Sequence, residues 1–372
     1  MRGVELMRVK KKYLIEWLLI ILSGILIYFL VDNDAFLYKD PVAQIVSVTN
    51  SKATKTEDTY KNKDMTTEQT LKVKVLNGHR KGEVLTAKNT FSKSGGYDQR
   101  FYRGQKVFIK FEKSDGKLMA MINNYKRDVY LIMLCWAVVV LLFLVTQIRG
   151  FTSLISVILN FIIFLLCVQL DVKWNINNFF WIFATVAVIF LALSLVLVIG
   201  FNWQCLVTFS SIFIGTTLAM IIGVVAMQVT NDKGVHYEAL DFATQSPKQL
   251  FLAATVIGLL GAVMDAATDI VSTLFEMKRT QPGISRKQLF ISGQNVGKSI
   301  MGPLVNVLLL IFFAETVTMA VLFFRTGNSI AYTFEWTMSL GIIQSLISGI
   351  GITLVIPSAS LLSSLVLGSD NK

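Results

Sequence analysis

The chain has few cysteines, few histidines and few charged residues for its length. It contains 372 residues but only three cysteines and two histidines. Each cysteine lies inside an apolar run, where cysteine usually acts as a small apolar side chain, so a disulfide framework, a cysteine zinc site and a thiol nucleophile are not indicated. His79 and His236 are too few for a histidine metal cluster. We therefore expect no metal, no cofactor and no catalytic residue, and we do not interpret the chain as an enzyme.

Charge is scarce and unevenly distributed. Only 16% of the residues are charged, against about 25% in soluble proteins, and the mean hydropathy is +0.59. The segment from Asp32 to Asp128 holds 12 of the 24 acidic residues and 19 of the 35 Lys and Arg residues. From Val129 to Gly368, long apolar runs follow one another with short polar breaks. This composition predicts an integral membrane protein with one polar segment near the N-terminus.

The net charge of +11 does not indicate a nucleic-acid partner. No cluster of Lys and Arg is interleaved with exposed aromatic residues, as a nucleic-acid groove requires. A basic excess in cytoplasmic loops is instead the ordinary result of the positive-inside bias. The basic excess of the polar segment is interpreted either as a solvated surface or as a surface that lies close to anionic lipid or wall polymer.

The first 31 residues predict an uncleaved membrane anchor. Residues 1–13 are basic, and an apolar run over 14–31 follows them, about as long as the ~20 residues that a bilayer needs. The run ends in VDNDAF, without the small-x-small pattern of a cleavage site. The basic start places the N-terminus in the cytoplasm.

Residues 32–128 predict a small all-β domain outside the membrane. Period-2 alternation, which is typical of strands, occurs in VAQIVSV, TLKVKVL, EVLTAKN, KVFIKF and KLMAMI. NGHRKG and KSDGK between them have turn chemistry, and the polar stretch 49–67 is interpreted as a loop or mobile insertion. Short strands in this number predict a small antiparallel barrel or sandwich, which would act as a lid or docking module.

Residues 129–356 predict a seven-helix membrane domain, which makes about eight transmembrane helices with the anchor. The loop 276–287 carries four Lys and Arg residues and is therefore expected in the cytoplasm, as are both termini. Residues 357–372 are interpreted as an amphipathic or cytoplasmic tail, either a kinked continuation of the last helix or a surface segment. The spans are expected at 129–147, 151–170, 179–200, 205–228, 250–275, 300–324 and 336–356.

The residues most indicative of function lie in GLLGAVMDAATDIVSTLFEMKR, from Gly258 to Arg279. Asp265, Asp269, Ser272 and Glu276 share one face of the expected helix. An aspartate in mid-membrane costs ~3 kcal/mol if it faces lipid, so this face should line the bundle or a water-filled cavity. Two carboxylates four residues apart favour binding of a proton or a cation. The alternative is an interhelical hydrogen-bond network with no transport role.

A second polar stripe follows in SGQNVGKSIMGPLVN, residues 292–306. Lys298 or Asn306 is predicted to face the aspartates, and would complete an ion pair or a polar pocket. Asn295 lies on the same stripe, and Glu315 is a further carboxylate inside the next apolar stretch. Asn295, Glu315 and Glu276 are additional candidates for the ion or substrate pocket. GQNVGKS is not a phosphate-binding loop, because Gly293 and Gly297 are too close together and no strand precedes them.

These motifs resemble the YibE/F family of bacterial membrane proteins. The resemblance rests on GxxGAVMDxxxDIxS at Gly258–Ser272, on E-x-x-x-x-x-P-x-x-S-x-x-x-L at Glu276–Leu289, and on G-x-x-I-M-G-x-x-x-N at Gly297–Asn306. LNGHRKGEVLTAKN and YDQRFYRGQKVFI extend it to the polar segment. One departure is Lys298-Ser299, where the family commonly has a basic-acidic pair. The resemblance implies a multi-pass protein of the bacterial plasma membrane, with a second copy or a YibE/F-type protein as partner.

The leading functional interpretation is a transporter or transport-associated permease of unknown cargo. Asp265 and Asp269 would bind the coupling proton or cation, and Ser272, Lys298 and Asn306 would complete the pocket. The alternative is a membrane scaffold or receptor whose external domain binds a partner. An intramembrane hydrolase comes third, because an aspartyl dyad needs its two carboxylates on facing helices.

Overall fold

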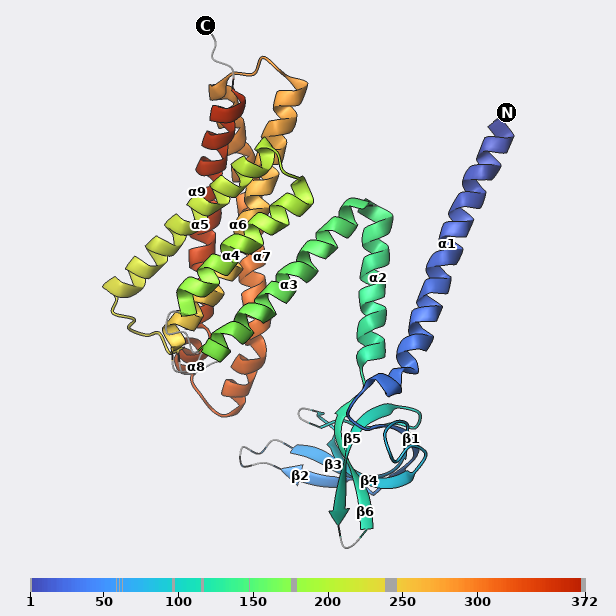
Figure 1. The fold of residues 1–372 in the computed structure, drawn as a ribbon. Coiled ribbons are helices and arrows are strands. Elements are labelled where there is room, and N and C mark those ends of the chain that lie inside the picture. The colour runs from blue at the N-terminus through green and yellow to red at the C-terminus, as the bar shows by residue number, and fades with distance from the viewer. Residues whose placement is uncertain are drawn as a thin grey trace. The chain divides into compact units, whose positions relative to one another are not determined.

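The computed structural model describes residues 2–57, 59, 61, 63–95, 98–114, 117–146, 148–174, 179–237 and 246–368 (Figure 1). The structure does not describe the side chains of residues 2–15, Ser114, Lys117, Ile148, Arg149 and Trp174. The side chains of the predicted basic N-terminus, the end of the tail and parts of the loops at 147–150, 171–177 and 229–248 thus lie outside the described residues. The chain divides into two compact units, Met1–Gln147 and Ile148–Lys372, and each is described by itself.

The first unit contains a small β-barrel. Its strands are β1 (Val42–Asn50), β2 (Thr54–Glu57), β3 (Lys63–Val75), β4 (Val84–Ser92), β5 (Lys106–Ser114) and β6 (Lys117–Tyr125). They pair in the order β1-β5-β6-β4-β3-β2, and an additional β1–β3 pairing closes the barrel. All pairings are antiparallel except a short parallel contact between β4 and β6 at Ala87 and Ala120. The predicted small barrel is confirmed.

The barrel core follows from the alternation in the sequence. In β3, Leu71, Val73 and Val75 are buried while the intervening Lys72 and Lys74 are exposed, as expected for a sheet with one face on a core. The core also contains Ala43, Ile45, Ala87, Phe101, Val107, Ile109 and Ala120. The turn motif NGHRKG behaves as predicted: Gly78 and Gly82 have positive φ values of 73° and 93°, which glycine adopts without steric cost.

The prediction of a loop over residues 49–67 is wrong. β1 continues to Asn50, β2 occupies Thr54–Glu57, and β3 begins at Lys63 and pairs with β2 through Thr54 and Thr66. The stretch has no apolar alternation, but its threonines are β-branched and favour extended backbone. Hairpin hydrogen bonds therefore form these strands without a buried face.

Two helices flank the barrel in sequence, α1 (Arg2–Asp32) and α2 (Asp128–Thr146), with a 3₁₀ turn η1 (Asp34–Leu37) after α1. The two helices pack against each other where Trp136 lies over Gly24, and a Cβ atom at Gly24 would be 2.8 Å from the indole ring. The Trp136 indole nitrogen donates a hydrogen bond to Ser23 Oγ at 3.1 Å. The anchor and the first span of the body therefore belong to the same unit.

The second unit is helical. It comprises α3 (Ile148–Trp174), α4 (Phe179–Ile199), α5 (Trp203–Val229), α6 (Pro247–Thr280), α7 (Arg286–Arg325), α8 (Ile330–Thr337) and α9 (Ser339–Leu367). In the described part of the chain, seven helices are long and apolar enough to cross a membrane: α2 to α7 and α9. These seven support the predicted multi-pass membrane protein, and α1 carries the further apolar run predicted at 14–31.

Helices α7 and α9 are longer than the predicted spans. α7 begins at Arg286 rather than at residue 300, because Ser285 and Gln288 form a capping box there. α9 begins at Ser339 and runs through Pro357 to Leu367, so of the two alternatives for this segment the helical continuation is the one observed. α9 packs against α5, α6 and α7, and its contacts form the core of this unit.

Candidate functional site

Helix α6 has one buried face and one open face. Leu259, Val263, Ala266, Ile270 and Leu274 are fully buried in the helical core. The other face carries Gly261, Asp265, Asp269 and Glu276, which are all exposed within the described part of the helical unit. Gly258, one turn before Gly261, is also exposed but lies beside Gln344 of α9, because a Cβ atom there would be 2.9 Å from the amide nitrogen. Asp265, Asp269 and Glu276 share this face, as the spacing predicts, whereas Ser272 is half-buried. Around Asp265 the face is open among the described residues of the helical unit.

Asp265 and Asp269 lie at the middle of this open face. Asp265 is the nineteenth of the 34 residues of α6, and the two aspartates, one turn apart, are neighbours on the helix surface. In the described part of the chain, neither carboxylate accepts a hydrogen bond or forms an ion pair. A Cβ atom added at Gly261 would meet no atom within 4 Å, so the surface beside Asp265 is open.

The polar residues nearer the Thr280 end of α6 have partners. Ser272 Oγ accepts a hydrogen bond of 3.0 Å from the Gln204 amide nitrogen, at the start of α5. Glu276 accepts a hydrogen bond of 3.0 Å from Arg279 on the same helix, and both side chains are largely exposed. Ser272 therefore joins two helices, while Glu276 belongs to a solvated surface pair.

Residues of the second polar stripe also lie on an open surface. Asn295, Lys298, Asn306 and Glu315 of α7 are all exposed. Gly293, by contrast, lies on a packed face of α7, because a Cβ atom there would be 2.5 Å from Ser360 Oγ of α9 and 3.0 Å from Leu274 of α6.

The predicted pairing of Lys298 with the aspartates is not made within the chain. Lys298 follows Gly293 by five residues, so its side chain leaves α7 about 140° away from the packed position of Gly293. No ion pair joins Lys298 to Asp265 or Asp269 among the described residues. The two polar stripes are thus separate open surfaces of one helical unit.

A buried lysine that the sequence did not reveal connects the barrel to its two flanking helices. The Lys126 side chain is fully buried, and its ammonium lies 2.7 Å from Asp34 and 2.7 Å from Asp128. It also donates a hydrogen bond of 3.0 Å to the backbone carbonyl of Val31. Tyr38 donates a hydrogen bond of 2.6 Å to Asp128, so the end of α1, the turn after it and the first residue of α2 meet at one ammonium group.

This arrangement keeps Lys126 charged. Burial by itself lowers the pKa of the lysine, but the hydrogen bonds and charges of Asp128 and Asp34 outweigh it, so its pKa is raised above the ordinary value of 10.5. The same carboxylates raise the pKa of the Tyr38 hydroxyl, chiefly through the hydrogen bond to Asp128. Both groups hold their protons at neutral pH and tie the barrel to α1 and α2.

A second cluster absent from the sequence interpretation joins α3 to α4. The Ser194 hydroxyl accepts hydrogen bonds from Asn160, at 2.7 Å, and from Ser156, at 3.1 Å. These polar groups lie in apolar helices, where hydrogen bonds across helices replace water. The cluster holds two helices together and contains no titratable group.

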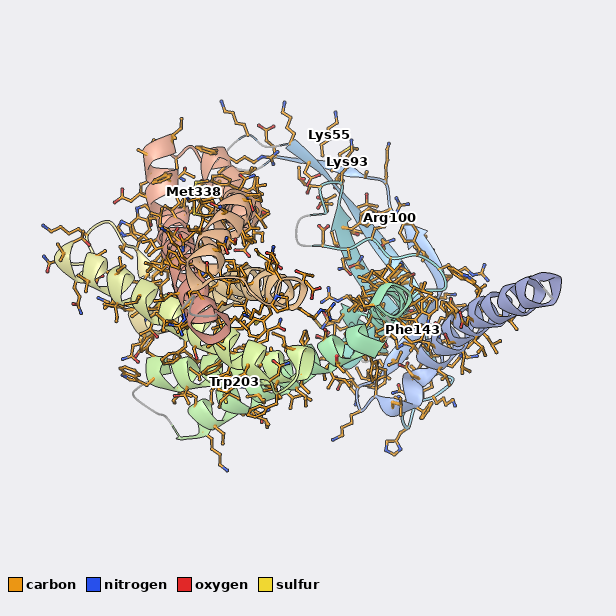
Figure 2. The ribbon with its side chains drawn as sticks, turned by 90° about the horizontal axis from the view of Figure 1, so that it is seen from above. Lys55, Lys93, Arg100, Phe143, Trp203 and Met338 are labelled. Atoms are coloured by element: carbon orange, nitrogen blue, oxygen red, sulfur yellow. The ribbon has the colours of Figure 1, made fainter. Side chains whose placement is uncertain are left out.

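The barrel has a concave surface lined by two basic residues, Lys93 and Arg100, and one acidic residue, Asp98. A pocket of about 550 Å³ is lined by residues that include Met65, Phe91, Lys93 and Arg100, and Lys55, Lys93 and Arg100 can be followed in Figure 2. The Arg100 guanidinium lies 5.4 Å from the ring centre of Phe91 and 5.1 Å from that of Tyr102. Such stacking holds an arginine in place for recognition of an anionic group.

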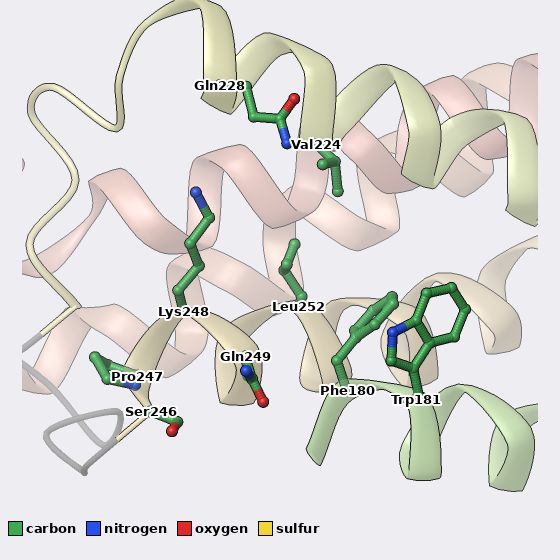
Figure 3. A pocket seen from close by; sticks show the side chains of 9 residues that line it. All are labelled: Phe180, Trp181, Val224, Gln228, Ser246, Pro247, Lys248, Gln249 and Leu252. Carbon is green, nitrogen blue, oxygen red and sulfur yellow. The ribbon is translucent and has the colours of Figure 1, made fainter. Parts of the chain in front are cut away.

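A further pocket lies where α4 and α6 begin and α5 ends. Its volume is about 460 Å³, and its lining residues are shown in Figure 3: Phe180, Trp181, Val224, Gln228, Ser246, Pro247, Lys248, Gln249 and Leu252. Asp265 lies 17 residues beyond Lys248 along α6, ~26 Å along the helix axis. This pocket is therefore separate from the carboxylate pair.

Two family models match the sequence. The model described as YibE/F-like protein matches residues 134–369, and that of the YibE/F family N-terminal domain matches residues 36–125. The first covers the helical unit with both polar stripes, and the second covers the barrel. No curated protein and no solved structure matches the chain.

Proposed function

The chain belongs to the YibE/F family, and we propose that it is a membrane transporter or transport-associated permease that binds a proton or a cation at Asp265 and Asp269. The supporting observation is the open face of α6, on which both carboxylates lack a partner within the described chain. The cargo is an ion or small molecule that the face itself does not identify.

The carboxylates of Asp265 and Asp269 would be unfavourable if they faced lipid. An ionised aspartate in mid-bilayer costs ~3 kcal/mol on insertion scales, so lipid tails are excluded as neighbours of Asp265 and Asp269. In this proposal water covers them, or a partner that is a second copy or another YibE/F protein. A water-lined face that carries two adjacent carboxylates attracts cations and protons, because each carboxylate raises the other's affinity for positive charge.

The proposed setting is the bacterial plasma membrane with both termini in the cytoplasm. The loop between α6 and α7 carries four Lys and Arg residues over 276–287, which favours its cytoplasmic location. The beginning of α6 would then lie at the outer surface, on the same side as the barrel.

Ion uptake into liposomes tests this function. The full chain is reconstituted with a pH-sensitive dye inside the vesicles, and H⁺, Na⁺ and K⁺ gradients are imposed in turn. We expect a flux that the Asp265→Asn, Asp269→Asn double variant loses, and that Glu112→Gln on β5 of the barrel retains. Equal flux in the double variant and the native protein would exclude the carboxylates as the coupling site.

A scaffold or receptor is the second candidate, and the basic pocket of the barrel favours it. Lys93 and Arg100 line that pocket, and Arg100 is stacked on two rings. If no imposed gradient drives flux through well-folded protein, the barrel would be the functional part, with an anionic polymer or an acidic protein segment as its partner. Binding of polyanionic probes to the full chain, lost in Arg100→Gln, would then be expected.

A further inference from the structure

An apolar groove extends from the pocket in Figure 3 along α4 and α5. It has a volume of about 540 Å³, and α4 contributes Phe180, Ala184 and Leu191 while α6 contributes Val256 and Leu260. The groove and the pocket share three residues, Phe180, Trp181 and Val224. They therefore form one continuous amphipathic site with a polar mouth and an apolar channel.

The length of the groove matches one leaflet of a bilayer. Leu260 lies 13 residues after the beginning of α6, and Leu191 lies 12 residues after the beginning of α4. These separations correspond to ~20 Å and ~18 Å along the helix axes. The hydrocarbon of one leaflet is ~15 Å thick, half of a ~30 Å core, so an acyl chain that enters at the mouth reaches the end of the groove at the bilayer midplane.

The mouth offers groups that bind an anionic oxygen. The Ser246 side chain does not cap α6, and Pro247 occupies its first turn. Within the described residues, backbone N–H groups at this helix end are thus open to a ligand. Lys248 forms an ion pair of 2.5 Å with Asp232, but an ammonium group has three donors and this side chain also lines the pocket. Gln228 and Gln249 supply further polar groups to the mouth.

Two more observations point to an amphipathic ligand. The Gln249 Oε1 atom is buried without a hydrogen-bond partner in the described chain, so a donor on the ligand would satisfy it. Trp181 is 68% exposed beside the mouth, where tryptophan is typical of the boundary between head groups and hydrocarbon.

We propose that this site binds a phospholipid, with one acyl chain in the groove between α4, α5 and α6 and its phosphate at Lys248 and the first turn of α6. The phosphate accepts from the ammonium and the backbone N–H groups. An amine or hydroxyl of the head group donates to Gln249. The orientation proposed above places this lipid in the outer leaflet. The site is independent of the aspartate pair, which lies farther along α6 and faces away from the apolar groove.

Lipid retention by the purified full chain tests this proposal. The protein is exchanged into detergent, and bound lipid is measured by native mass spectrometry and by phosphorus analysis. We expect the native protein to retain phospholipid, Ala184→Trp to lose it because the indole fills the groove, and Lys248→Gln to lose it at a lower detergent concentration. Ala314→Trp, an exposed alanine of α7, is the matched control and should retain lipid as the native protein does.

Back-addition identifies the part of the lipid that is recognised. Delipidated protein is titrated with a phospholipid, a diacylglycerol with the same chains, and palmitate. Tight binding of the phospholipid alone supports the assignment of the phosphate. Equal binding of diacylglycerol would overturn the proposal. It would also be overturned if the Ala184→Trp variant, with unchanged thermal unfolding, retained as much phospholipid as the native protein. In either case only non-specific annular lipid would remain.

Discussion

At the scale of single residues, Lys126 is a fully buried charge with two carboxylates beside it. Its buried ammonium compensates two carboxylates that come from different ends of the domain, Asp34 after α1 and Asp128 at the first residue of α2. A buried pair adds little net stability when formed, because desolvation opposes it, but the loss of one partner leaves an uncompensated charge. Removal of Lys126 should therefore cost more stability than formation of its two ion pairs contributes.

The Lys126→Met variant is expected to destabilise the barrel by ~3–5 kcal/mol, since Asp34 and Asp128 would remain buried without a cation. Urea unfolding followed by protease resistance of residues 36–125 measures this change. Arg80→Met, which removes one partner of an exposed pair with Glu83, is the matched control and should cost less than ~1 kcal/mol. Equal stability of the two variants would contradict the importance of the buried network.

The same residue predicts an alkaline limit of stability. The pKa of Lys126 is raised in the folded state, so its contribution is complete below the ordinary pKa of 10.5 and declines as the pH rises through the higher, folded value. Between neutral pH and that window, the free energy of unfolding should not depend on this group. In Lys126→Arg the guanidinium keeps its charge, so the additional alkaline loss should be absent; an identical alkaline profile in both proteins would contradict the prediction.

At the scale of helices, α7 and α9 are held together by close approach at glycines. A Cβ atom at Gly297 would lie 2.3 Å from Ile356, whereas one at Gly302, five residues along α7, would meet nothing within 4 Å. α7 thus has a packed face and an open face. Gly297 allows α9 to approach closely, whereas Gly302 makes no such contact.

Replacement of these two glycines by alanine should separate the two faces. Gly297→Ala forces α7 and α9 apart and is expected to destabilise the helical unit by ~1–3 kcal/mol, while Gly302→Ala should be neutral or slightly stabilising because alanine favours helix. Thermal unfolding in detergent provides the comparison. A similar loss in both variants would show that the open face of α7 is packed in the folded protein.

The elements were predictable to different degrees. The strands with an apolar face, such as β3 around Leu71 and Val73, follow from alternation, but β2 does not, since its four residues are all exposed. The early beginning of α7 was missed because polar residues between Arg286 and Gly297 conceal a helix that its capping box begins. The apolar pattern of the sequence predicts elements with a buried face. It does not predict elements that are stabilised mainly by backbone hydrogen bonds or by capping.

At the scale of the whole molecule, the sequence predicted which residues of α6 share a face but not what surrounds them. The spacing of Asp265 and Asp269 predicted a common stripe, and the structure leaves that stripe open. The Lys126 network could not be foreseen, because its partners Asp34 and Asp128 are brought together only when the barrel closes. The lipid groove likewise depends on how α4, α5 and α6 cross, which helical periodicity does not determine.

The chain combines a closed barrel with a helical unit, and among the described residues of that unit the carboxylates of Asp265 and Asp269 have no hydrogen-bond or ion-pair partner. In a bilayer the face that carries them requires water or a second protein surface. Hydration of that face is the central claim, because proton or cation binding at Asp265 and Asp269 depends on it.

The most direct measurement is thiol labelling in native membranes. Asp265→Cys and Asp269→Cys are made in a chain in which Cys135, Cys167 and Cys205 are replaced by alanine, and each is treated with a small charged thiol reagent. Leu218→Cys, at an exposed apolar position in the middle of α5, serves as the lipid-facing control. We predict that both aspartate positions are labelled and that Leu218→Cys is not. Labelling of neither aspartate position would show a dry face, contradict the transport account and favour the scaffold.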